Sequence, residues 1–206
     1  MAPWITVGIG LLAAPALAHH PFGGQTPANA WEGFLSGLGH PVIGFDHLVF
    51  VLAIGLLAAT KTKGWLLPVT FVAATLFGTG IHLWGWNLPA PEVIIAASVW
   101  TLGLILAMGS ALNLATLAGL GLLAGLFHGY AYGEAIIGAE MTPLVAYLLG
   151  FGAIQLAIAS GVYGLVARCF QGEISEGATS PRLPLRFAGF TILGIGVTLL
   201  SGFVVG

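Results

Sequence analysis

Apolar residues run along this sequence in seven long blocks that are separated by short polar segments. The first block covers 1–18, and the other six cover about 41–60, 65–86, 91–110, 113–133, 142–167 and 184–205. Each of these six is close to the ~20 residues that a helix needs to cross ~30 Å of hydrocarbon. The pattern predicts an all-α membrane protein with six transmembrane helices after an N-terminal signal peptide.

The signal peptide is predicted from the end of the first block. Residues 16–18 read Ala-Leu-Ala, which is a small-x-small cleavage site after an apolar stretch. The alternative is a retained first helix, since no Lys or Arg precedes the apolar stretch. If cleavage occurs, the mature chain begins at His19, outside the cytoplasm.

Prolines mark three of the predicted helix starts. Pro41, Pro91 and Pro143 each stand where a first helical turn would begin. Proline is tolerated there because the N–H that it lacks would have no partner in the helix.

The basic residues orient the six segments in the membrane. Lys61 and Lys63 lie between the first and second segments, and Arg168, Arg182 and Arg186 flank the connection between the fifth and sixth. Both connections fall on the same side when the crossings are counted, and the positive-inside rule makes that side cytoplasmic. We therefore expect a multi-pass protein of a bacterial-type cytoplasmic (inner) membrane, with the mature N-terminus and the C-terminus extracytoplasmic.

Composition agrees with this class and excludes several others. Hydrophobic residues make up 58% of the chain, its mean hydropathy is +1.02, and 6% of its residues are charged, against about 25% in soluble proteins. The net charge of −2 gives no basic surface for nucleic acid. The single cysteine, Cys169, excludes a disulfide framework, and no P-loop sequence is present for ATP hydrolysis.

Ionisable side chains gather at the predicted outer ends of the segments. Such groups are costly inside a membrane and are candidates for function. Imidazoles and carboxylates without thiolates are ligands for divalent first-row cations. The candidate metal ligands are His19, His20, His40, Asp46, His47, His82, Glu92, His128 and Glu134.

The first cluster stands at the start of the first segment. His40 and His47 are seven residues apart, so on one helix they would point into the same cavity with Gly44 between them. Asp46 would lie about 100° away. It either completes the site or orients an imidazole by a hydrogen bond. The alternative is a helix cap by His40 and an Asp–His hydrogen bond.

The second cluster closes the fourth segment. His128 and Tyr132 are four residues apart and share a helix face. Glu134 would converge with His128 only where the helix ends or loosens near Gly133. Glycines recur every four residues in this segment, a pattern that lets a neighbouring helix pack closely; they are Gly121, Gly125, Gly129 and Gly133.

Together these strings resemble the HupE/UreJ family of nickel/cobalt transporters, whose signatures are HxxxxxDH in the first span and FHGx[AV]HGxE in the fourth. The first signature is matched in full by His40, Asp46 and His47. In the second, Tyr132 stands where the family usually has histidine, and Glu134 follows Gly133 directly. The resemblance implies a transported Ni²⁺ or Co²⁺, with Zn²⁺ fitting less well. Because Tyr132 replaces the usual histidine, Co²⁺ is a candidate alongside Ni²⁺.

The remaining candidates have supporting roles. His19 and His20 would form a capture site at the mature N-terminus or a disordered polar tail, and His82 and Glu92 would join the site or pair with each other. Ser98, Tyr132 and Gln155 are candidates to line a path through the membrane.

The sequence therefore predicts three parts: a signal peptide at 1–18, an extracytoplasmic His-containing segment at 19–40 and a six-helix transmembrane metal permease domain at 41–206. The predicted activity is secondary, ATP-independent uptake of Ni²⁺ or Co²⁺ by a protein that is not an enzyme, is embedded in the lipid bilayer and can form a homo-oligomer. The alternatives are an intramembrane zinc-dependent hydrolase with His and Asp ligands, an accessory subunit that hands metal to a partner and, with less support, a b-haem protein.

Overall fold

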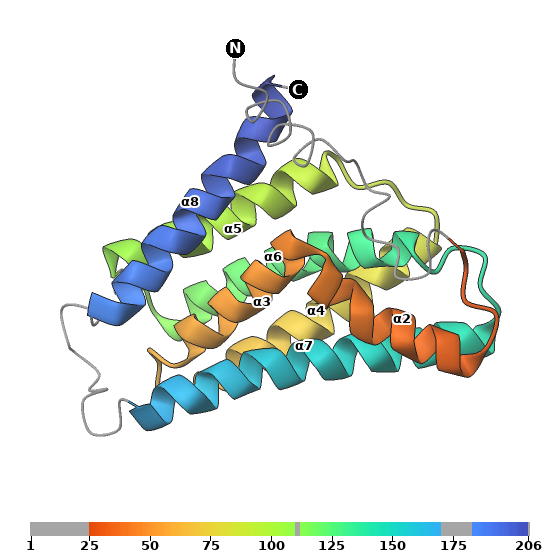
Figure 1. The fold of residues 1–206 in the computed structure, drawn as a ribbon, viewed down its shortest axis with the longest axis horizontal. Helices are drawn as coiled ribbons and strands as arrows, with labels where there is room; N and C mark the ends of the chain where they lie inside the picture. The colour runs from red at the N-terminus through yellow and green to blue at the C-terminus, as the bar shows by residue number, and fades with distance from the viewer. Residues whose placement is uncertain (1–24, 110–111, 170–182, 206) are drawn as a thin grey trace, which may run out of the picture.

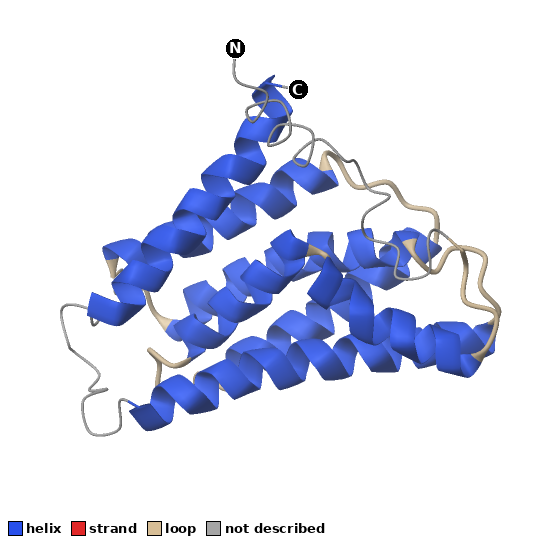
Figure 2. Ribbon diagram, viewed as in Figure 1, coloured by secondary structure: helices blue, strands red, loops and turns tan. Residues whose placement is uncertain are grey.

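The computed structural model describes residues 25–109, 112–169 and 183–205, and this part of the chain is all-helical, without strands (Figures 1 and 2). The predicted all-α class is confirmed. The signal peptide at 1–18, His19 and His20 lie outside the described residues. The helices are α2 (Ala30–Ile43), α3 (Phe45–Ala58), α4 (Leu66–Leu83), α5 (Pro91–Met108), α6 (Leu114–Glu134), α7 (Met141–Cys169) and α8 (Leu183–Val205).

Five helices, α4 to α8, are each long and apolar enough to cross a membrane. Their ends lie within three residues of the predicted segments. Pro91 begins α5 and Pro143 lies in the first turn of α7, as predicted. The agreement follows from one constraint: a backbone in hydrocarbon must bond to itself, so an apolar block of this length forms a helix.

The first predicted segment differs, because it is a bent pair of helices. α2 and α3 meet at Gly44 with a bend of 78°, and together they count as a sixth candidate span. The prediction that Pro41 opens a helix is wrong, since Pro41 lies inside α2 near its C-terminal end. A proline inside a helix removes a hydrogen bond to the preceding turn, which favours ending the helix soon afterwards.

The start of α2 has a clear sequence signal. Asn29 caps the helix by accepting the backbone N–H of Glu32 at 3.0 Å, and the Glu32 carboxylate accepts the backbone N–H of Ala28 at 2.9 Å. This arrangement is similar to a capping box, but Glu32 accepts from the residue before the N-cap and from the Asn29 side chain. The predicted extracytoplasmic His-containing segment at 19–40 therefore contains most of α2, which packs against α7.

Helices pack closely in three pairs: α2 with α7, α4 with α6, and α5 with α8. Glycine lies at each contact, where an added side chain would collide with the backbone of the partner helix. Small residues in membrane helices permit this close approach, and it gains van der Waals contact where lipid gives no hydrophobic drive. The tightest of these glycines are Gly33, Gly37 and Gly150 in the first pair, Gly78 and Gly129 in the second, and Gly103, Gly189 and Gly196 in the third.

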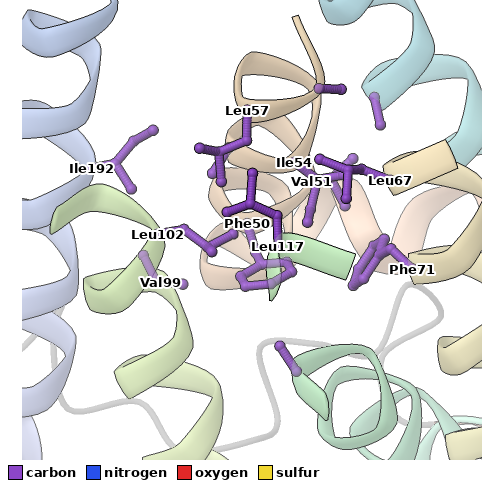
Figure 3. Close-up of a cluster of buried hydrophobic side chains, with 14 of the residues drawn as sticks. Phe50, Val51, Ile54, Leu57, Leu67, Phe71, Val99, Leu102, Leu117 and Ile192 are labelled. Atoms are coloured by element: carbon purple, nitrogen blue, oxygen red, sulfur yellow. The ribbon is translucent and has the colours of Figure 1, made fainter. Parts of the chain in front are cut away.

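α3 lies at the centre of the core and is buried on most of its surface. Figure 3 shows Phe50, Ile54 and Leu57 of α3 among side chains from α4, α5, α6 and α8. A helix that is apolar on all sides is stable when the protein surrounds it. Most residues of α3 therefore contact protein, with Phe45 exposed in its first turn, and His47 is buried against the other helices.

Charge is divided between the two ends of the helices. Lys61 and Lys63 follow α3, Arg168 lies at the end of α7 and Arg186 near the start of α8, at the left of Figure 1. The carboxylates at helix ends on the opposite side are the half-buried Glu32 and the exposed Glu92, Glu134 and Glu140. Arg182 lies outside the described residues.

The close contact of α6 with α4 gives a stability prediction. In Gly129→Ala the new methyl group would collide with the Thr75 carbonyl group, so the two helices must separate. Overpacking of this kind costs about 1–3 kcal/mol, and we expect a lower thermal midpoint in detergent, measured by tryptophan fluorescence.

Gly119→Ala is the matched control on the same helix, because a side chain at Gly119 meets open space. We expect an unchanged or slightly higher midpoint there, since alanine favours helix more than glycine. Equal midpoints for the two variants would contradict the packing argument.

Candidate metal centre

The break at Gly44 brings His40 and His47 together. Their ring centroids lie 5.8 Å apart, and the two side chains are 2% and 1% exposed. The two residues do meet as predicted, but the reason given for it is wrong, because they lie on two helices at 78° and share no helix face. The bend turns the C-terminal end of α2 toward the first turn of α3.

His128 joins this pair from α6, far away in sequence. The Nδ1 atoms of His47 and His128 lie 2.9 Å apart, and His128 is fully buried. The Ser98 hydroxyl donates to the Ile95 carbonyl, so at 3.1 Å it accepts the N–H at Nε2 of His128. In a neutral His128 this leaves Nδ1 as the acceptor, and His47 donates to it from its own Nδ1.

His40 is oriented by α7. The Tyr147 hydroxyl donates to the Tyr132 carbonyl at 2.7 Å and lies 3.1 Å from Nδ1 of His40, whose N–H it accepts. In neutral rings, Nε2 of His40 and of His47 is then the nitrogen with the lone pair. Fixing the tautomer of a histidine by a bond to its other nitrogen is how proteins prepare metal ligands.

Tyr132 packs against both His40 and His47. Its ring centroid is 5.1 Å from that of His40 and 4.6 Å from that of His47, and the side chain is fully buried. Its hydroxyl donates to Oε1 of Gln155, and the Gln155 amide donates to the Phe151 carbonyl and to the Thr75 hydroxyl. The Tyr132 ring therefore contacts both imidazoles, while its hydroxyl bonds to Gln155 of α7.

The predicted carboxylates are placed less centrally. Asp46 is half-buried in the first turn of α3, where its Oδ1 accepts the backbone N–H of His47 at 2.9 Å. Glu92 and Glu134 are exposed at the start of α5 and at the end of α6. Among residues 25–109, 112–169 and 183–205, no three His, Cys, Asp or Glu side chains are arranged to hold a metal ion.

His82 lies apart from the buried imidazoles. It is half-buried near the end of α4, with its ring centroid 4.2 Å from that of Tyr130. Its Nδ1 is the buried side-chain polar atom in the described part of the chain that makes no hydrogen bond. His82 also packs against Gly133, which places it beside the end of α6 that carries Glu134.

Two residues of the site were not predicted from the sequence. Tyr147 orients His40, and Phe50 packs its ring 4.3 Å from that of His128. A signal existed for Tyr147, because a phenol inside an apolar span needs a hydrogen-bond partner. Phe50 carries no comparable signal, since one more phenylalanine in an apolar helix is ordinary.

Comparison with known proteins agrees with the two motifs. A model of the family described as HupE / UreJ protein matches residues 7–199. The curated Protein HupE of Rhizobium leguminosarum bv. viciae is 30% identical over 200 residues, which cover 96% of this chain and 97% of that protein. No solved structure matches. The chain belongs to the HupE/UreJ family.

Proposed function

We propose that this protein carries out ATP-independent uptake of a divalent cation, Ni²⁺ or Co²⁺, across the cytoplasmic membrane. The observation that carries the proposal is the buried contact of His40, His47 and His128, which come from three helices of a membrane domain. Imidazole nitrogen suits Ni²⁺ and Co²⁺, and membership of the HupE/UreJ family points to the same metals.

Binding would replace one interaction by another. The lone pair of a neutral His128 lies at Nδ1, which now accepts the hydrogen bond from His47, so this bond must open before His128 can bind the metal, at a cost of about 1 kcal/mol. Asp46 adjoins His47 and supplies the nearest negative charge on α3. Neutral imidazoles with one carboxylate would leave a bound divalent ion with net positive charge, which favours its release.

The charge distribution supports inward movement. Lys61, Lys63, Arg168 and Arg186 mark the cytoplasmic end by the positive-inside rule. The exposed Glu92 and Glu134 then face the outside, where they would concentrate cations, and His82 lies beside the end of α6 that carries Glu134. His19 and His20 would add a capture site before them.

The membrane potential can supply the energy. One charge gains about 2.3 kcal/mol per 100 mV, so a divalent ion gains roughly twice that. Because about 1.4 kcal/mol is a factor of ten, a potential of 100 mV can hold a gradient of about 10³ without ATP. We propose transport rather than hydrolysis, because uptake that is driven by the membrane potential requires metal ligands and no catalytic group.

We expect His47→Ala and His128→Ala each to reduce uptake at least about tenfold, because each removes a buried imidazole from the site. The measurement is radiometal uptake into proteoliposomes, comparing Ni²⁺, Co²⁺, Zn²⁺ and Mn²⁺. Thr191→Ala is the control, since Thr191 is exposed on α8 and bonds only within its helix. Uptake equal to that of the parent in both histidine variants would remove the imidazoles from the mechanism.

A second prediction concerns the driving force. In proteoliposomes without ATP, a potassium diffusion potential that is negative inside should drive accumulation of ⁶³Ni²⁺ or ⁵⁷Co²⁺. Collapsing the potential with valinomycin and equal potassium on both sides should abolish net accumulation, because the charge then gains no energy on entering. Accumulation that persists without the potential, or that requires ATP, would contradict potential-driven uptake.

A further inference from the structure

Two hydroxyl groups contact the buried imidazoles in the same way. The Ser98 hydroxyl on α5 lies 3.1 Å from Nε2 of His128, and the Tyr147 hydroxyl on α7 lies 3.1 Å from Nδ1 of His40. Each hydroxyl comes from a helix that carries none of the three buried histidines. Because an imidazole has two nitrogens, the bond that one nitrogen makes decides whether the other can bind a metal ion.

The proton of each hydroxyl is directed to a backbone carbonyl group. Ser98 donates to the Ile95 carbonyl at 2.7 Å, which is the bond to the preceding turn that serine makes inside helices. Tyr147 donates to the Tyr132 carbonyl at 2.7 Å. A hydroxyl has one proton to donate, so toward its imidazole each of the two can act as an acceptor of an N–H.

The Tyr132 carbonyl group fixes the direction of the bond at Tyr147. It lies in the last turn of α6, where carbonyl groups have no partner within the helix. The backbone N–H of Ile136, which would be its partner in a longer helix, donates to the Gly133 carbonyl instead. Turning the Tyr147 proton toward His40 would cost the Tyr132 carbonyl its hydrogen bond in a buried place.

We propose that Ser98 and Tyr147 are positioning residues of the metal site, which fix the nitrogen through which two of its imidazoles bind the ion. Ser98 keeps the His128 proton on Nε2, so that His128 binds through Nδ1. Tyr147 keeps the His40 proton on Nδ1, so that His40 binds through Nε2. Without the hydroxyl, the imidazole can take the other tautomer, in which an N–H faces the ion. The proposal rests on the proposed transport function, since it concerns the same imidazoles.

Ser98→Ala and Tyr147→Phe each remove one hydroxyl and leave every histidine in place. We expect the dissociation constant for Co²⁺ or Ni²⁺, measured by calorimetry in detergent, to rise at least about tenfold in each variant, because loss of a group that orients a metal ligand costs about 10–100-fold in affinity. Ser98→Thr keeps the hydroxyl and should bind metal as the parent does. Ser98 lines a half-open apolar cavity of about 160 Å³, so the added methyl group has room.

Two controls make the same chemical changes away from the imidazoles. Ser201→Ala removes an exposed hydroxyl on α8 that donates to the carbonyl group three residues earlier, the same bond that Ser98 makes. Tyr163→Phe removes the hydroxyl of a second tyrosine on α7, which packs against the apolar core. Both controls should bind metal as the parent does. A parental dissociation constant in Ser98→Ala or in Tyr147→Phe would overturn the proposal for that residue.

Nitrogen NMR tests the positioning roles in the metal-free parent protein, and it decides the matter if a variant does not fold. Protonated and unprotonated imidazole nitrogens have well separated ¹⁵N chemical shifts. At a pH above the usual imidazole pKa, the spectrum of histidine-labelled protein should show His128 protonated at Nε2 and His40 protonated at Nδ1. The signals are assigned by their loss in His128→Ala and His40→Ala. In Ser98→Ala, both tautomers of His128 should appear.

The spectra also separate this proposal from the transport function. If His128 or His40 of the parent carries its proton on the opposite nitrogen, while the parent takes up Co²⁺ or Ni²⁺, only the positioning roles fail. If the parent protein takes up neither ion, the transport function fails, and this proposal fails with it.

Discussion

The hydrogen bond between His47 and His128 ties the two sequence motifs of this protein together. It joins α3 to α6 in a region where an unpaired polar group would be costly. Ser98 satisfies the other nitrogen of His128, and Tyr147 and Tyr132 complete the surroundings of His40. Polar groups from α2, α3, α5, α6 and α7 therefore meet in one buried layer, and the helices around it are fixed by the bonds they must make.

Close helix packing makes this layer possible. Gly37 and Gly150 let α2 approach α7 closely, so that Tyr147 reaches His40. Gly129 does the same for α6 and α4, where the Thr79 hydroxyl donates to the Gly129 carbonyl. The glycines thus affect the site indirectly. Side chains at these positions would hold the helices too far apart for their polar groups to form hydrogen bonds.

The two ends of the molecule differ in a way that suits directed movement of a cation. Exposed carboxylates lie at one end and basic residues at the other, while neutral imidazoles occupy the buried layer between them. The two helices of the α5–α8 pair contact each other more extensively than they contact α3 and α6.

Hydropathy along the chain was enough to place the five helices α4 to α8, and the motifs gave the residue types of the site. Apolar blocks of about 20 residues specify membrane helices because the lipid satisfies no backbone group, and the motifs at His40–His47 and at His128 identified the family. Three further features could not be predicted from local sequence. The bend at Gly44, the role of Tyr147 and the cavity beside Ser98 depend on contacts between helices that are distant in sequence, and local hydropathy carries no information about which buried faces meet.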